Sequence, residues 1–246
     1  VISIILTLVF IICIIYLIIV KYNAKKNENM YLELYESMVI EPDETTTELA
    51  NINDKFIEKI KELQQINEDV KGWIRIEGTT VNYPLLQTSD NDYYLTHNYK
   101  KEKSSYGSIF MKQEANLLEN NSNVIIYGHN MRDEQMFNNL LKYKDKKYYQ
   151  EHPTIKIFTD EQETEYKIVS VFNSKVFYEY EQNVFRYYQY NNFEDENKYN
   201  EYISNCKKIQ LYDTGENVQY GEQLLTLITC EYSQENGRLI VIAKRS

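Results

Sequence analysis

Two apolar runs near the C-terminal end flank a short polar loop, and each run carries a chemically capable residue at the loop. Cys230 follows Gln223–Thr229, and Arg238 precedes Leu239–Ala243. A cysteine nucleophile needs a thiolate, and therefore a base or a positive neighbour. Acyl transfer also needs a donor where the oxyanion forms, and arginine keeps its charge and offers rigid donors. Two antiparallel strands would place Cys230 beside Arg238, so the pattern predicts thiol-based acyl transfer.

A histidine able to act as acid or base stands in VIIYGHNM, where His129 follows a predicted strand and Gly128. Glycine lets the chain turn and expose the next side chain, and histidine changes its charge near neutral pH. A histidine at a strand end is nevertheless structural more often than catalytic, and free cysteine is usually a small buried hydrophobe. Spacing alone leaves both interpretations open for His129 and Cys230.

The other candidate nucleophiles and ligands fit structural roles. Cys206 shares a predicted helix face with Tyr199 and Tyr202, which indicates a buried thiol. His97 lies in a polar loop, and His152, before a proline, is expected at the surface. A zinc site would need carboxylates that no pattern here specifies, and seven scattered glycines argue against a phosphate-binding loop. We therefore expect no metal and no cofactor.

The elements that must position these residues are mostly short strands bounded by turn signals. Two strands are predicted around the Gly78 turn in residues 72–87, and apolar residues at helical spacing predict a helix in residues 53–70. Many short strands with a few helices indicate a mainly β fold, a barrel or a sandwich with helical insertions. The further predicted strands are Ser108–Met111, Val124–Tyr127, Thr154–Phe158, Glu165–Phe172, Gln223–Thr229 and Leu239–Ala243, and the further helices are Gln135–Tyr149 and Asp195–Ile209.

The N-terminal segment, residues 1–20, has no charged residue and is long enough to cross a bilayer as one helix. A cleaved signal peptide would have a shorter apolar core and small residues at a cleavage site. We therefore interpret residues 1–20 as a transmembrane anchor. Residues 21–50 are polar and predict a partly helical stalk, and residues 51–246 form the predicted catalytic domain.

Charge limits the partners and gives a first indication of orientation. The net charge is −10 and no long Lys/Arg stripe occurs, so a nucleic-acid partner is not expected. Lys21, Lys25 and Lys26 follow the apolar segment, and by the positive-inside rule they place the domain in the cytoplasm.

Several separate motifs together resemble the class B sortases, over residues 51–246. TLITC resembles the active-site strand of that family, YGHNM its histidine motif, and GWIRIEGTTVNYPLLQTSDNDYYLTHNY and GSIFM its upstream blocks. The resemblance implies an eight-stranded β-barrel with N-terminal helices and a helix in the connection before the seventh strand. It also implies a membrane-anchored transpeptidase of Gram-positive bacteria, a thiol enzyme that cuts a C-terminal sorting signal of secreted proteins. The enzyme would join these proteins to a peptidoglycan amine, so the domain would face outward, against the indication from the three lysines.

The resemblance also assigns roles to single residues. Cys230 would be the nucleophile, His129 the acid and base, and Arg238 the group that stabilises the oxyanion or positions the substrate. The chain departs from the family beside the cysteine, where Ile228 replaces a frequent serine and Tyr232 replaces an aspartate of some members. These departures weaken the case for a third, acidic member of a triad. The positions that would bind substrate are Asn91, Leu95, Thr229 and Glu231.

Other functions stay open at this stage. A sortase that polymerises pilins has the same motifs as one that anchors proteins to the wall. Papain-like proteases place their cysteine before their histidine, the reverse of the order here, and L,D-transpeptidases carry an SHGC-like motif that this chain lacks. A non-catalytic surface binding module, with Cys230 as a buried hydrophobe, is the alternative from outside the enzymes.

Overall fold

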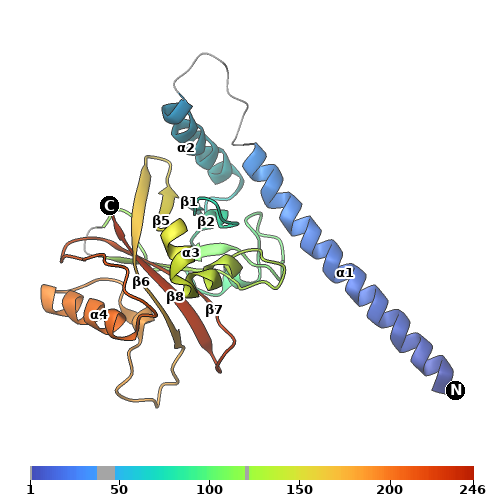
Figure 1. Cartoon of the computed structure of the whole chain (residues 1–246). Coiled ribbons are helices and arrows are strands. Elements are labelled where there is room, and N and C mark those ends of the chain that lie inside the picture. The colour runs from blue at the N-terminus through green and yellow to red at the C-terminus, as the bar shows by residue number, and fades with distance from the viewer. Residues whose placement is uncertain (1, 38–47, 120–121) are drawn as a thin grey trace. The chain divides into compact units, whose positions relative to one another are not determined.

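The described part of the N-terminal unit is dominated by one long helix. The computed structural model describes residues 2–37, 48–119 and 122–246, and the chain divides into two units, Val1–Asp43 and Glu44–Ser246. Helix α1, Ile2–Glu36, is long and apolar enough to cross a membrane (Figure 1). It continues without a break from the apolar segment into the polar segment predicted as a stalk. Residues 38–47 of that predicted stalk lie outside the described residues.

The second unit is built on a closed barrel with the strand order β1-β2-β3-β4-β7-β8-β6-β5 (Figure 1). The predicted mainly β, eight-stranded barrel is thus confirmed. Strands β5 and β6 close the barrel, because β5 pairs with β1 and β6 pairs with β8. The strands are β1 Val70–Arg75, β2 Asn82–Leu86, β3 Ile109–Met111, β4 Asn123–Tyr127, β5 Thr154–Phe158, β6 Glu163–Lys175, β7 Leu224–Cys230 and β8 Gly237–Arg245.

Helix α2, Glu48–Ile66, packs on β1 and β5 through the apolar face that the sequence predicts. Phe56 of this helix stacks on Phe158 with ring centroids 4.4 Å apart, and meets the ring of Trp73 edge-on at 6.2 Å. All three rings are buried. The helix therefore covers one side of the barrel and takes no part in the candidate site.

Helix α4, Glu196–Ile209, occupies the connection between β6 and β7, as expected. It begins after Asp195, whose side chain accepts a hydrogen bond from the Lys198 N–H and so caps the first turn. Tyr199, Tyr202 and Cys206 are buried on the face that packs against β6. The structural role predicted for Cys206 is therefore confirmed.

The predicted helix Gln135–Tyr149 is wrong as a single element. The segment forms the 3-10 helix η2, Asn138–Lys144, and the short helix α3, Lys146–Glu151. Asp145 separates them, because its backbone is extended (φ −93°, ψ 122°) and its side chain caps α3 by accepting from the Lys147 N–H. The apolar periodicity comes from side chains that pack on the barrel over both short helices.

Candidate active site

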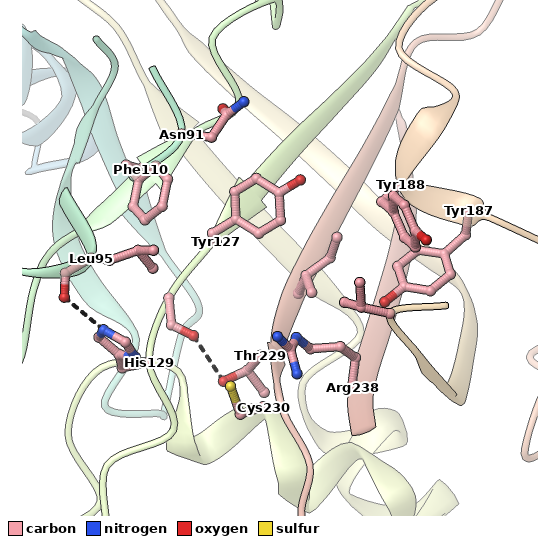
Figure 2. A pocket seen from close by; sticks show the side chains of 13 residues that line it. Asn91, Leu95, Phe110, Tyr127, His129, Tyr187, Tyr188, Thr229, Cys230 and Arg238 are labelled. Carbon is pink, nitrogen blue, oxygen red and sulfur yellow. Dashed lines mark hydrogen bonds between the residues drawn. The ribbon is translucent and has the colours of Figure 1, made fainter. Parts of the chain in front are cut away.

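The pairing of β4 with β7 brings the predicted histidine and cysteine to the same edge of the barrel. These strands are parallel, and Tyr127 is opposite Ile228 in their register. His129 and Cys230 each stand two positions further along the chain, so they lie at the same level at the end of the two strands. Strand β8 is antiparallel to β7 and pairs Arg238 with Cys230. All three predicted catalytic residues therefore border one site (Figure 2).

Three hydrogen bonds hold the turn that carries the histidine against the end of β7. The Gly128 N–H donates to Ile228 O at 3.2 Å, and the Thr229 hydroxyl donates to Gly128 O at 2.9 Å. The Asn130 side-chain amide donates to Cys230 O at 2.9 Å. These bonds fix the backbone on both sides of the thiol, while the Cys230 side chain stays half-buried and accessible.

The ring of His129 is oriented by the backbone of another segment. Its Nε2 lies 2.8 Å from the carbonyl oxygen of Leu95, the last residue of the 3-10 helix η1, Tyr93–Leu95. A carbonyl oxygen can only accept, so Nε2 must carry the proton of this bond. In the neutral ring, Nδ1 is then the nitrogen with the lone pair. Nδ1 is therefore the atom that can exchange a proton with a thiol or an amine.

Gly128 is required by space and not, as the sequence suggested, by a special turn. Its φ is not among the positive values of this chain. A Cβ at Gly128 would lie 2.4 Å from Ile109 Cδ1 and 2.7 Å from the ring of Phe137. Because glycine has no Cβ, these buried side chains can approach it closely. The backbone before His129 can therefore lie against the end of the barrel.

Arg238 is held at the start of β8 by its own loop. Its Nη1 donates to Gly237 O at 2.9 Å and to Asn236 O at 3.3 Å. Both bonds use Nη1, so within the described structure the donors on Nη2 and Nε remain for a ligand. Figure 2 shows the guanidinium directed toward the end of β7, where Thr229 and Cys230 lie.

A cavity of about 440 Å³ opens beside these residues, with mostly apolar walls and a few polar groups (Figure 2). Such a surface suits a peptide with apolar and polar side chains in defined places. Three of the predicted substrate-binding residues, Asn91, Leu95 and Thr229, border it. The lining residues are Asn91, Leu95, Phe110, Tyr127, Gly128, His129, Val176, Tyr187, Tyr188, Ile228, Thr229, Cys230 and Arg238.

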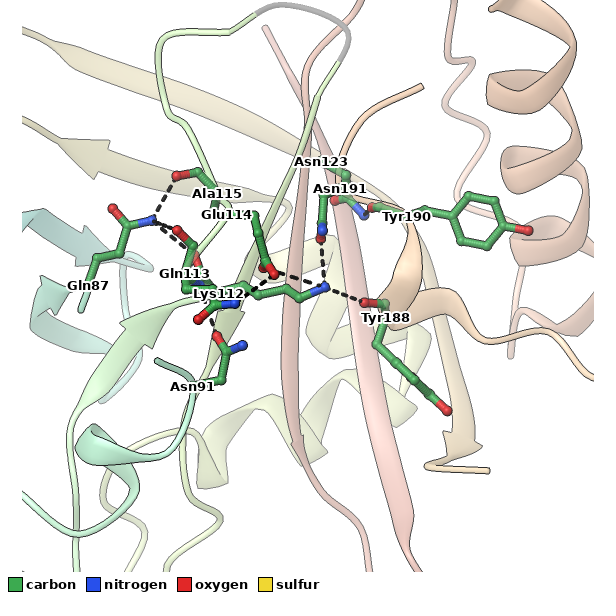
Figure 3. A network of polar contacts seen from close by, with 10 residues as sticks. All are labelled: Gln87, Asn91, Lys112, Gln113, Glu114, Ala115, Asn123, Tyr188, Tyr190 and Asn191. Carbon is green, nitrogen blue, oxygen red and sulfur yellow. Dashed lines mark hydrogen bonds and ion pairs between the residues drawn. The ribbon is translucent and has the colours of Figure 1, made fainter. Parts of the chain in front are cut away.

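A polar network supports the walls of this cavity from outside (Figure 3). The Lys112 ammonium donates to Tyr188 O at 3.0 Å and to Asn191 Oδ1 at 2.9 Å. The next residue, Gln113, donates its backbone N–H to Asn91 Oδ1 at 2.8 Å. The segment after β3 thereby joins the Asn91 wall to the Tyr188 wall and sets the width of the cavity.

Glu231, the fourth predicted substrate-binding residue, is not among the residues that border the cavity. Its buried carboxylate pairs with the Lys144 ammonium at 2.7 Å and accepts from Ser233. Burial alone would raise the pKa of Glu231, but the hydrogen bonds from Lys144 and Ser233 outweigh burial and hold this pKa below its usual value. The side chain thus ties the loop after Cys230 to η2.

Sequence reasoning missed most of the aromatic walls. Tyr127 belongs to the YGHNM motif, but only the register of the barrel strands shows that its ring forms a wall of the cavity. Tyr187 and Tyr188 belong to the 3-10 helix η3, Tyr187–Gln189, in a connection without periodicity. Burial raises the pKa of Tyr127 to about 12 although the Arg238 charge acts in the opposite direction. The phenol is therefore protonated at neutral pH and can donate hydrogen bonds.

The other two histidines of the chain have structural partners. The ring of His97 stacks on Tyr93 at a centroid distance of 4.0 Å, and His152 Nδ1 lies 2.8 Å from Glu77 O. In residues 2–37, 48–119 and 122–246, no group of three or more His, Cys, Asp and Glu side chains could hold a metal ion.

Comparison with known proteins gives one consistent family. The model of the Sortase domain matches residues 74–246. The chain is 34% identical over 225 residues to Sortase B of Listeria monocytogenes, covering 91% of this chain and 86% of the relative. It is 32% identical over 188 residues to Sortase B of Staphylococcus aureus, covering 76% of this chain and 74% of the relative. The solved Staphylococcus aureus sortase B–substrate complex superposes with a TM-score of 0.77 at 26% identity, covering 92% of this chain and 98% of that one.

The two cysteines of the barrel unit should differ sharply in reactivity. We expect iodoacetamide to modify Cys230 in the folded protein and to spare Cys206, because alkylation needs an accessible thiolate. Cys206 is 1% exposed, and burial raises the pKa of its thiol. Peptide mapping by mass spectrometry after timed labelling measures each site, and labelling in urea is the control that exposes Cys206. An inert Cys230, or equal labelling of both thiols, contradicts the assignment.

Acidic pH should destabilise the loop after Cys230, because it protonates the Glu231 carboxylate. Because its folded pKa lies below the usual 4.5, its contribution to stability is present above about pH 4.5 and is lost as the pH falls through the folded pKa. We expect the melting temperature of Glu231→Gln to fall less between about pH 7 and pH 3 than that of the parent protein. Glu62→Gln, on the exposed face of α2, is the matched control and should follow the parent curve. Parallel curves for Glu231→Gln and the parent would count against this role.

Proposed function

The chain belongs to the sortase family and is a class B sortase, and from this membership we propose that it attaches secreted proteins to the cell wall. Sortases are cysteine transpeptidases that act on proteins with sorting motifs and on amine nucleophiles. The substrate would be a C-terminal sorting signal, and the acceptor an amine of peptidoglycan or its precursor. The observation that carries this proposal is the register that aligns His129, Cys230 and Arg238 at one edge of the barrel.

In the first half-reaction, Cys230 would act as the nucleophile. Its thiolate Sγ attacks the carbonyl carbon of a threonine in the sorting signal, and the carbonyl oxygen becomes an oxyanion. Arg238 donates to that oxygen, since charged donors placed where charge develops lower the barrier. His129, as imidazolium, gives its Nδ1 proton to the departing amine. The C–N bond breaks and a thioester of Cys230 remains.

In the second half-reaction, the acceptor amine would take the place of the departed peptide. Its nitrogen attacks the thioester carbonyl, and Nδ1 of His129 accepts the amine proton. The Cys230 thiolate leaves as the new amide forms. The Leu95 carbonyl keeps the proton on Nε2 in both half-reactions, so the same ring nitrogen, Nδ1, serves as acid and then as base.

The substrate-binding residues would contribute in different ways. Asn91 and Leu95 border the cavity and would contact the peptide. Thr229 would act through its backbone, because its hydroxyl is already bonded to Gly128 O. Glu231 would act indirectly, by holding the loop between Cys230 and Arg238 through Lys144 and Ser233.

We propose that α1 anchors the enzyme in the membrane as a single span, with the catalytic domain outside the cell. The length and apolar character of this helix support the anchor. Secreted proteins and wall amines are met outside the cytoplasm, which supports the orientation. Lys21, Lys25 and Lys26 favour the opposite orientation, so the outward orientation rests on where the substrates are met.

A covalent intermediate is the most direct test of this function. We expect short peptides with a fixed threonine at the scissile position to form a thioester adduct on Cys230, seen by intact mass. Cys230→Ala should form none, since the nucleophile is gone. Cys206→Ala is the matched control and should form the adduct, because Cys206 is buried away from the cavity. An adduct on Cys230→Ala, or its loss in Cys206→Ala, would overturn the assignment.

Replacing Arg238 by lysine should be severe although the charge is kept. A point charge on a flexible stem does not replace a planar fork, and loss of one oxyanion donor typically costs about 10²–10³ in kcat. We expect a fall of that size in kcat for Arg238→Lys, measured as peptide cleavage. Arg245→Lys, on the same strand but outside the cavity, is the control. Near-normal rates for Arg238→Lys would argue against an oxyanion role.

A further inference from the structure

Tyr187 places an unpartnered hydroxyl beside the candidate site. The residue begins η3, its side chain is fully buried, and it borders the cavity. Its ring meets Phe172 edge-on at 5.8 Å and Tyr188 edge-on at 5.1 Å, so its position is well fixed. Within the described part of the chain, its hydroxyl has no hydrogen-bond partner. Leaving a buried hydroxyl unpaired is energetically unfavourable, so such a group in a native structure calls for an explanation.

The place of this hydroxyl distinguishes it from the other orphaned polar atoms. Among the described residues, Asn173 Oδ1 and Gln210 Oε1 are also buried without a partner, but neither residue borders the cavity. Tyr187 does, together with Cys230 and Arg238. The unpaired group that faces the chemistry is therefore the Tyr187 hydroxyl.

The Tyr187 hydroxyl stays protonated in this setting. Burial raises the pKa of Tyr187, and the Arg238 charge acts to lower it. The phenol is therefore neutral, and it can accept one hydrogen bond while donating another. Figure 2 shows its hydroxyl end directed toward β8 at the position of Arg238.

In the described structure, Arg238 is bonded to its own loop through Nη1 only. Its Nη1 donates to Asn236 O and Gly237 O, in the loop that joins β7 to β8. Nη1 carries two N–H groups, so each can serve one of these carbonyls, and the N–H groups on Nη2 and Nε are left for other acceptors. A further acceptor facing Nη2 or Nε would hold the rest of the planar fork.

We propose that Tyr187 is a positioning residue for Arg238, with its hydroxyl accepting a hydrogen bond from the guanidinium when a peptide fills the cavity. One donor of the fork is then held by Tyr187, and another faces the carbonyl under attack. The bond satisfies the phenol and fixes the guanidinium at the same time. This inference rests on the proposed function, because it assumes that Arg238 acts on the reacting carbonyl.

The experiment is a double-mutant cycle on the full chain in detergent. Tyr187→Phe, Arg238→Ala and the double variant are compared with the parent, using an internally quenched library of short peptides with a fixed scissile threonine. Acylation is followed by intact mass in single turnovers, so that slow variants remain measurable. Tyr143→Phe is the control: the Tyr143 hydroxyl donates to His152 O at 2.8 Å, and the residue does not border the cavity.

We expect Tyr187→Phe to lower the acylation rate about tenfold in the parent, as for loss of one hydrogen bond to a charged group. In the Arg238→Ala background, Tyr187→Phe should change the acylation rate less than about twofold, since the effects of substitutions in residues that act as a unit are not additive. The melting temperature of Tyr187→Phe should equal that of the parent, because the Tyr187 hydroxyl makes no hydrogen bond to the described residues of the free enzyme. Tyr143→Phe should show the reverse, a lower melting temperature and an unchanged rate.

The other outcomes each decide against the inference. An unchanged rate for Tyr187→Phe overturns it, and so does an equal loss in both backgrounds, which would mean that Tyr187 acts independently of Arg238. A lower melting temperature with an additive loss would show a structural role. If no peptide of the library acylates the parent enzyme, the proposed function itself is contradicted. That result does not depend on the behaviour of Tyr187→Phe.

Discussion

The parallel pairing of β4 with β7 is the constraint on which the candidate site depends. In a parallel pair, both strands end at the same edge of the sheet, and their register decides which residues meet there. Tyr127 opposite Ile228 sets His129 level with Cys230. A slip by one residue would exchange the inner and outer faces of β7 and move Cys230 away from the level of His129.

Polar groups at the opposite end of the two strands add to this constraint. The Thr226 hydroxyl donates to Asn123 Oδ1 at 2.7 Å, and the Asn123 amide donates to Tyr190 O at 2.9 Å. Both side chains are buried, so an altered register would leave them unpaired, at a cost of about 1–3 kcal/mol each. Because Tyr190 lies in the connection that follows η3, the same bonds also place the segment that carries Tyr187 and Tyr188.

Local sequence signals explain how much of this arrangement could be predicted. β-branched and apolar residues identify β7 within one residue and β8 within two residues at each end, and the Asp195 cap with its apolar face identifies α4. The apolar pattern between Gln135 and Tyr149 predicts one long helix. The segment forms two short helices instead, because a capping aspartate divides it. The cavity walls in η3 carry no periodic signal, and the ion pair of Glu231 with Lys144 joins residues too distant in sequence for any spacing rule. Both depend on how the connections cross the barrel end.

The loop between Cys230 and Arg238 has one rigid part and one variable part, and this division has an evolutionary consequence. A Cβ at Gly237 would lie 2.2 Å from Glu231 O, so the base of the loop tolerates neither a larger residue nor a change of length without moving Arg238. The tip is different, since Tyr232 is 75% exposed. Mutations there leave the reacting atoms in place and change the surface that an incoming molecule first meets. Substitutions can therefore accumulate at the tip of the loop while its two ends preserve the positions of Cys230 and Arg238.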